Sequence, residues 1–329
     1  MKPTNTLLGY VLISTIASLF GATGTANAAE GKSRIELKQD DDAGQLGVWI
    51  DGKEAFVYQY GEDADLPHYY PVRSPAGESM TVQKTEPFPH HRSFWFADRV
   101  KLGDGRPVNT YGALYTEAKT PDAPTRFRDG VRHVETTVDE QGESEVVLSK
   151  KLLWYMDHDT PVLDESRKMR VVALGDGEYF LDVTFTVTAG YGDVTFVSDA
   201  THYAWPYVRM NGEFNVQAGG GKIVNSEGGV NQQGTNGKVA RWIDYSNTTG
   251  EKNAGLAIFS HPDNPQPHQW LTRDYGCFGP RRIDERSGKP FTLEKGQSLK
   301  RRVGVLVHRG DVETGRVAER YEQYARGGL

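Results

Sequence analysis

The feature that most constrains this chain is a strict alternation of apolar and polar side chains. It is clearest over residues 179–189, where one side of the segment is apolar and the other carries mostly threonine and aspartate. Alternation with a period of two predicts a β-strand with one face in the core and one face that is wet or faces a ligand. The members of the apolar face are Leu181, Val183, Phe185, Val187 and Ala189.

Shorter runs of the same kind recur along the chain, separated by Gly, Pro, Asn and Asp. The predicted strands cover 34–38, 47–50, 54–60, 68–72, 131–138, 145–155, 167–174, 179–189, 194–197, 239–245, 255–259, 291–293 and 300–308. Asp51-Gly52 is a strong hairpin signal, and the polar, aperiodic segment 103–124 predicts a long loop. Helical periodicity is convincing over 311–326, with Asp311 as N-cap. We therefore predict an all-β protein, a large twisted β-sandwich with one C-terminal helix.

The first 28 residues have the pattern of an export signal. Lys2 is the one charge, a largely apolar run covers 7–20, and Ala26-Asn27-Ala28 is a small-x-small cleavage site. The run is shorter than the roughly 20 residues that a membrane span requires, and no later run approaches that length. We predict a signal peptide over 1–28, a single domain over 29–329, a periplasmic or secreted location and no membrane insertion.

Charge and cysteine content narrow the candidate partners and the source of stability. The formal net charge is −6 and no basic block occurs, so nucleic acid is not an expected partner. Cys277 is the single cysteine, so an exported chain of this kind depends on a packed core rather than on a disulfide.

Two stretches about 170 residues apart gather imidazole, guanidinium and indole groups, which are costly to bury without partners. They run over 89–96 and 261–276, and a smaller cluster over 202–207 gathers histidine and aromatic side chains. We expect the first two to form one cleft, with His91 and Arg92 on one wall and His268, Arg273 and Asp274 on the other.

General acid–base chemistry on a sugar suits these groups, because a histidine beside a carboxylate can move protons near neutral pH. The candidate catalytic residues are His90, His91, His202, His261, His268, Asp274 and Glu165, and Asp244 is a further candidate carboxylate. The candidate substrate-binding residues are Arg92, Trp95, Trp205, Arg241, Trp270, Arg273 and Tyr275. The arginines suit a uronate, a sulfate or a developing oxyanion, and the rings suit sugar faces.

A metal site is the less favoured reading of the histidines. His90 and His91 are adjacent and point opposite ways in a strand, and no His-x-His or His-Glu-x-x-His pattern occurs. No metal and no other cofactor is therefore expected.

Three blocks of the chain resemble the signature blocks of exported bacterial proteins labelled PmoA-like, or "methane oxygenase PmoA". The blocks are residues 89–96, 238–245 and 261–280, and the resemblance extends over nearly the whole mature chain. It implies a galactose-mutarotase-like β-supersandwich, a fold common among carbohydrate-active proteins, and it brings no settled mechanism. Residues 98–105 replace the turn expected after Trp95. The oxygenase label conflicts with the sequence, since a membrane methane oxygenase subunit needs several apolar spans.

These features favour an exported carbohydrate-active enzyme that processes a glycan or keto-sugar as a lyase, hydrolase or epimerase. One alternative is a non-catalytic glycan-binding accessory protein of a polysaccharide-utilisation system. A second alternative is the metal-dependent oxygenase that the family label suggests. Carbohydrate is the expected partner in the first two cases.

Overall fold

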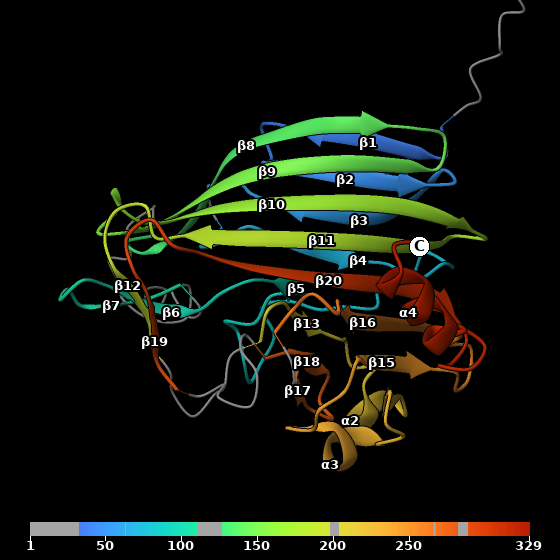
Figure 1. Ribbon diagram of the computed structural model, residues 1–329. Coiled ribbons are helices and arrows are strands. Elements are labelled where there is room, and N and C mark those ends of the chain that lie inside the picture. The colour runs from blue at the N-terminus through green and yellow to red at the C-terminus, as the bar shows by residue number, and fades with distance from the viewer. Residues whose placement is uncertain (1–32, 63, 111–126, 198–203, 266–267, 282–288) are drawn as a thin grey trace, which may run out of the picture. The chain divides into compact units, whose positions relative to one another are not determined.

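Two stacked antiparallel sheets of eight strands each dominate the structure (Figure 1). The computed structural model describes residues 33–62, 64–110, 127–197, 204–265, 268–281 and 289–329. Contacts divide the chain into residues 1–32 and a unit of residues 33–329, and it is the second unit that is described here. The expected signal peptide therefore lies outside the described residues.

The first sheet has the strand order β1-β2-β3-β4-β5-β13-β18-β17. Its strands are β1 (Ile35–Asp40), β2 (Gln45–Ile50), β3 (Lys53–Gln59), β4 (His68–Val72), β5 (Phe94–Trp95), β13 (Tyr207–Arg209), β17 (Trp270–Thr272) and β18 (Cys277–Pro280). Asp51 and Gly52 both have positive φ in the tight turn between β2 and β3, so the predicted hairpin is confirmed.

The second sheet has the order β14-β15-β16-β20-β11-β10-β9-β8. Its strands are β8 (Gly130–Gln141), β9 (Glu145–Met156), β10 (Thr160–Gly175), β11 (Glu178–Thr188), β14 (Lys222–Asn225), β15 (Trp242–Asn247), β16 (Ala254–Ser260) and β20 (Ser298–Arg309). A four-stranded sheet lies at one end, in the order β19-β12-β6-β7. It contains β6 (Arg99–Leu102), β7 (Pro107–Asn109), β12 (Val194–Phe196) and β19 (Phe291–Leu293).

Apolar side chains from the facing sides of the two large sheets form one core. The predicted faces of β11 are confirmed, because Leu181, Val183 and Phe185 are at most 1 % exposed whereas Thr184 is half-buried. Phe180 is the exception on the outer face, since it is buried beneath the C-terminal helix. The predicted class, an all-β sandwich with one C-terminal helix, is confirmed.

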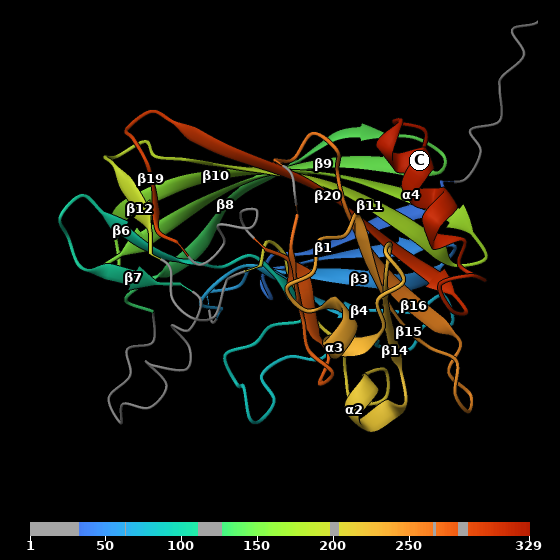
Figure 2. The same cartoon turned by 60° about the horizontal axis from the view of Figure 1, so that its bottom comes forward.

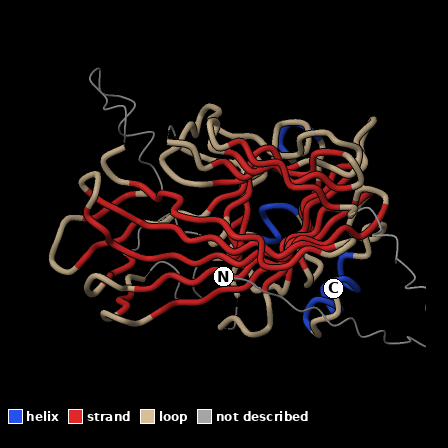
Figure 3. Tube along the Cα trace, turned by 90° about the horizontal axis from the view of Figure 1, so that it is seen from above, coloured by secondary structure: helices blue, strands red, loops and turns tan. Residues whose placement is uncertain are grey.

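Three helices accompany the strands in the described residues. α4 (Val317–Ala325) packs on the outer face of the second sheet, near the C-terminus in Figure 3. α2 (Val216–Gly219) and α3 (Asn231–Thr235) are single turns near β14, as Figure 2 shows. None of these described helices is long and apolar enough to cross a membrane.

The expected start of the C-terminal helix was wrong. Asp311 accepts a hydrogen bond from the Thr314 N–H (2.9 Å) and so caps a turn, but Arg316 has φ of 50° and the helix begins at Val317. α2 and α3 were not predicted, and β7 occupies part of the segment 103–124 that was expected to be a loop. Residues 111–126 of that segment lie outside the described residues.

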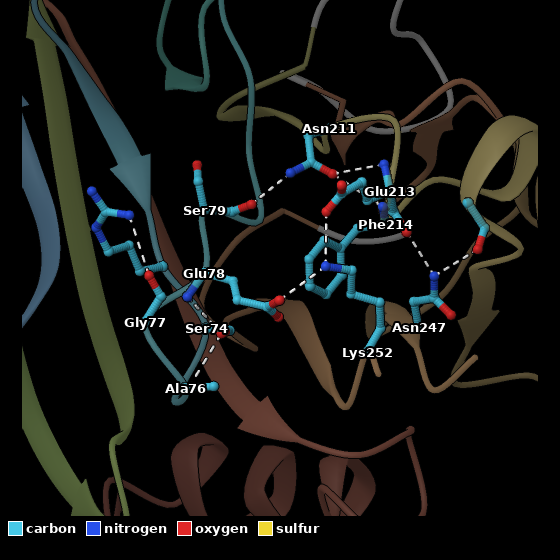
Figure 4. Close-up of polar contacts among 12 residues, drawn as sticks. Ser74, Ala76, Gly77, Glu78, Ser79, Asn211, Glu213, Phe214, Asn247 and Lys252 are labelled. Carbon is cyan, nitrogen blue, oxygen red and sulfur yellow. Dashed lines mark hydrogen bonds and ion pairs between the residues drawn. The ribbon is translucent and has the colours of Figure 1, made fainter. Parts of the chain in front are cut away.

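Polar contacts fix the loop that follows β13. Lys252 donates to Glu78 (2.9 Å) and to Glu213 (2.8 Å), and Asn211 donates to the Ser79 carbonyl (2.5 Å), as Figure 4 shows. Three segments that are far apart in sequence are thereby joined. Exposed ion pairs of this kind contribute about 0–1 kcal/mol each, so their effect here is mainly to position the loop.

Candidate functional site

Four short strands at one end of the first sheet carry the candidate site. In the register of β5, β13 and β18, Trp95 lies opposite Tyr207 and Arg209 lies opposite Cys277. Tyr207 and Arg209 are two residues apart, so their side chains leave the same face of β13. Neighbouring strands therefore present indole, phenol, guanidinium and thiol groups on a single face.

The loop before β5 covers this face and meets the segment before β18. Phe88 lies 5.0 Å from Tyr275 between ring centroids, and His91 stacks on Phe88 at 4.9 Å and on Tyr275 at 6.4 Å. The guanidinium carbon of Arg209 lies 4.3 Å from the centre of the Tyr275 ring. The structure thus brings the two stretches singled out in the sequence side by side.

We call the resulting group of polar side chains the donor cluster, because each of its members can donate a hydrogen bond. Its members are His90, His91, Arg209, Arg273, Tyr275 and Arg281. His91 and Arg209 are buried, whereas the other four are half-buried. Trp95 and Tyr207 lie beneath it, with their rings stacked at 4.8 Å.

The electrostatics of the cluster favour neutral imidazoles. Burial, and after it the neighbouring His90 and Arg209, lower the pKa of His91 to about 3. Burial and the charge of Arg92 lower the pKa of His90 below its ordinary value. At neutral pH both rings are therefore uncharged and His91 is a weak base.

The phenol and the thiol are also held in their neutral forms. Burial raises the pKa of Tyr275 to about 12 and that of Cys277 to about 12, although Arg273 acts in the opposite direction on both. A thiol with such a pKa is not an activated nucleophile. Tyr275 retains its proton and is able to donate it.

The two half-buried arginines of the cluster have neutral partners. Arg273 donates to Asn236 Oδ1 (2.7 Å) and to the Thr272 carbonyl (2.9 Å), and Arg281 donates to Gln269 Oε1 (3.0 Å). Burial, followed by the charge of Arg273, lowers the pKa of Arg281 below its ordinary value. The two positive charges therefore oppose each other across this face.

Two residues expected on the walls of a cleft, Arg92 and His268, have other bonding partners. Arg92 is fully buried in an ion pair with Asp65 (2.5 Å). His268 is 2 % exposed, with Nδ1 bonded to the Ser260 hydroxyl and Nε2 to the Arg281 carbonyl (2.9 Å). Arg92 and His268 are therefore buried structural residues and do not form the walls of a cleft.

Asp274 anchors α3 to the end of β17. Its carboxylate accepts the Gln232 N–H (2.8 Å), and its own N–H donates to the Gln232 side chain (3.1 Å). This reciprocal pair gives Asp274 a structural role in place of the expected catalytic one.

The tryptophans expected to stack on sugars present no exposed ring. Trp95 and Trp270 are 0 % exposed and Trp205 is 3 % exposed. Trp270 donates to the Ala240 carbonyl (2.8 Å), and Trp205 packs edge-on against Phe185 and Phe196. Their size places them in the core. The half-buried rings of Phe88 and Tyr275 are the more accessible aromatic surface.

His261 lies elsewhere in the molecule, at the end of β16. The Arg302 guanidinium donates to its Nε2 (3.0 Å), and its ring meets Tyr324 of α4 at 5.1 Å. A surface depression of about 490 Å³ on the outer face of the second sheet begins at the following residues, Asp263 and Asn264.

The remaining predicted groups pair inside other elements. Glu165 is buried and bonds Trp154 (2.9 Å) and Arg167 (2.6 Å), whereas Asp244 is buried against His308 (2.8 Å). Arg241 is exposed and pairs with Glu322 of α4 (2.9 Å). None of Glu165, Asp244 and Arg241 joins the donor cluster.

His202 lies outside the described residues. The described residues contain no group of three or more His, Cys, Asp or Glu side chains placed to hold a metal ion.

Four residues at this site were not predicted from the sequence: Phe88, Tyr207, Arg209 and Arg281. A signal for two of them exists, because Tyr207-Val208-Arg209 alternates and so places Tyr207 and Arg209 on one face. Arg281 directly follows the third sequence block and gave no local signal of its own.

The solved structures to which this chain is similar include the GH36 alpha-galactosidases AgaA and AgaB from Geobacillus stearothermophilus, with TM-scores of 0.48 and 0.46 and 9 % identity. Each alignment covers 85 % of this chain but 41 % and 42 % of the respective galactosidase. Galactose 1-epimerase from Lactobacillus acidophilus NCFM is also similar, with a TM-score of 0.37, 9 % identity, and coverage of 85 % of this chain and 100 % of the epimerase.

This chain spans about four tenths of the length of those galactosidases, and the scores assign it neither an activity nor a substrate. No curated protein matches the sequence. A family model does match, over residues 45–322. The chain therefore belongs to the family of unknown function DUF6807.

Proposed function

We propose that this protein is an exported carbohydrate-active enzyme that processes a glycan or keto-sugar by proton transfer at the donor cluster. The observation that carries the proposal is the contact of His91 with Tyr275 beside Arg209. A neutral imidazole can accept a proton, a neutral phenol can donate one, and a guanidinium can stabilise negative charge on oxygen. Lyase, hydrolase and epimerase reactions on sugars all require such transfers.

The experiment is to incubate the purified protein with a panel of polysaccharides and keto-sugars and to follow the products. We expect turnover of at least one member, with a loss of about 10²–10⁴ in rate for His91→Ala and a comparable loss for Tyr275→Phe. His158→Ala is the matched control, because His158 lies exposed in the turn between β9 and β10. Full activity of both site variants would overturn the assignment of these residues.

A second function, glycan binding without catalysis, is favoured by the pKa of His91. A base with a pKa of about 3 is poorly matched to neutral pH, whereas a binding protein has no such requirement. Saturable binding of a glycan with an unchanged product spectrum would favour this accessory function. The oxygenase role suggested by the PmoA-like resemblance remains a further alternative, and oxygen uptake dependent on added transition metal would favour it.

A further inference from the structure

We infer that the saccharide bound at the donor cluster carries a negatively charged group, either a carboxylate or a sulfate ester, which Arg273 and Arg281 recognise. This inference rests on the proposed function and names the substrate class.

Several buried and half-buried arginines in other parts of the described chain pair with carboxylates, whereas Arg301 and Arg309 donate to backbone carbonyls. The pairs are Arg73 with Glu54, Arg92 with Asp65, Arg106 with Asp129, Arg167 with Glu165, Arg302 with Asp182 and Arg320 with Glu178. Arg273 and Arg281 differ, because among the described residues their hydrogen-bond partners are amide and carbonyl oxygens. Within the described part of the chain, neither charge is paired with a carboxylate.

Like charges held close together oppose each other, and more strongly where water is partly excluded. Arg273 donates to the side chain of Asn236, and Nη2 of Arg281 lies against the next residue, Gly237, so the two guanidinium groups are close together. In keeping with this, the charge of Arg273 lowers the pKa of Arg281. A fold that retains such a pair is destabilised by it unless an anion is present. Charges perturbed in this way are typical of functional sites.

Other polar groups close to Arg273 and Arg281 are also hydrogen-bond donors. The indole N–H of Trp95 is fully buried and has no acceptor in the described part of the chain, and Nε of Arg281 is likewise unbonded. Buried donors without acceptors are rare in folded proteins. Arg281 has further guanidinium N–H groups beyond the one that Gln269 accepts.

These hydrogen-bond donors favour a ligand whose oxygen atoms only accept hydrogen bonds. A neutral sugar hydroxyl both donates and accepts, so it also needs acceptors from the protein, whereas carboxylate and sulfate oxygens only accept. Guanidinium groups bind such oxygens through short, charge-assisted hydrogen bonds. The rings of Phe88 and Tyr275 lie against each other and against the Arg209 guanidinium, and they suit the apolar face of the sugar that carries the anion.

Titration calorimetry on the purified protein tests this inference with matched ligand pairs. One arm compares uronate oligosaccharides with their methyl esters, and the other compares sulfated oligosaccharides with their desulfated forms. We expect the charged member of at least one pair to bind at least about tenfold more tightly than its neutral partner. The affinity should fall as salt is raised, because the anion pairs with half-exposed charges.

Arg273→Gln and Arg281→Gln should each weaken that binding at least about tenfold, the loss expected for a charge-assisted hydrogen bond. Arg241→Gln is the matched control, because its guanidinium pairs with Glu322 on the surface of α4. Unfolding midpoints of the three variants separate loss of binding from loss of fold. The salt dependence of the unmodified protein gives a test that needs no variant.

The outcomes separate this inference from the proposed function. Equal binding of charged and neutral members overturns the anion requirement and leaves a carbohydrate function in place. Inorganic sulfate that binds as tightly as the sulfated saccharide overturns the saccharide part. If no charged or neutral saccharide is bound or converted, the proposed function and this inference both fail.

Discussion

Lys150 is an ammonium group inside the sandwich, and it is only 2 % exposed. Its Nζ lies 4.9 Å from the centre of the Tyr58 ring, on the inner side of β9. Burial, with a further contribution from Arg167, lowers the pKa of Lys150 to about 7. A cation–π contact offsets part of the desolvation cost, but the charged lysine remains unfavourable in the folded state.

Replacement of this lysine is expected to stabilise the protein. The unfolded chain binds the lysine proton up to a pH of about 10.4, so between pH 7 and 10 the unfolded state holds more protons than the folded state. Stability contributed by this group therefore rises with pH over that window and is lowest below pH 7. Lys150→Met should raise the free energy of unfolding by about 1–4 kcal/mol at pH 6.5 and by less at pH 9.5.

Urea denaturation at the two pH values measures both effects. Lys151→Met is the control, since Lys151 is the exposed neighbour that pairs with Glu135 on the surface. A loss of stability in Lys150→Met at pH 6.5, or a gain of equal size at both pH values, would contradict the argument.

At the scale of elements, α4 joins the sandwich through aromatic rings. Tyr324 is 1 % exposed and meets Phe180 at 5.2 Å and Phe259 at 5.9 Å. The helix has only nine residues, which is too short to be stable alone. Its order therefore depends on this packing.

Tyr324→Ala should lower the free energy of unfolding by about 3–5 kcal/mol, as expected when a buried aromatic residue is removed. Glu319→Ala on the exposed side of the same helix should change it by no more than about 0.5 kcal/mol. Chemical denaturation followed by tryptophan fluorescence compares the two variants. Similar losses in both would show that helix propensity, and not the aromatic contact, determines the stability of α4.

The longer strands could be predicted because each depends on a local pattern, whereas the short strands β6, β7, β13, β14, β17 and β18 were not predicted. Period two placed β11 and its buried face correctly, and Asp51-Gly52 fixed a hairpin. Partners that come from distant parts of the chain could not be predicted in the same way. From the sequence we interpreted Arg92 as a ligand-binding residue, because no residue near it in the sequence indicates that Asp65 neutralises its charge.

The site shows the same division between local and distant information. The two stretches rich in histidine and arginine do lie side by side, as expected, but Arg92, His268 and Asp274 have structural partners that the sequence did not indicate. Trp205 and Trp270 were expected to bind sugar, yet side chains of that size also fill a core, and sequence does not separate the two uses. Arg209 and Arg281 join the donor cluster through the register of β13 and β18, which only the fold reveals.

At the scale of the whole molecule, stability comes from packing and not from covalent links. Cys277 is the single cysteine and is buried, and burial raises the pKa of its thiol to about 12. We expect the same melting temperature with and without a reducing agent, and reaction with a thiol reagent only on unfolding. Calorimetry and labelling under native conditions measure the two. A melting temperature that falls on reduction would contradict this expectation.

The position of β20 has a consequence for how the chain is made. It is the last strand in the sequence, yet it lies between β16 and β11 in the middle of the second sheet. A nascent chain that ends before residue 298 therefore has two half-sheets with open edges and nothing to join them. The second sheet cannot be completed until residues 298–309 have been synthesised, so the edges of β16 and β11 stay unpaired up to that point.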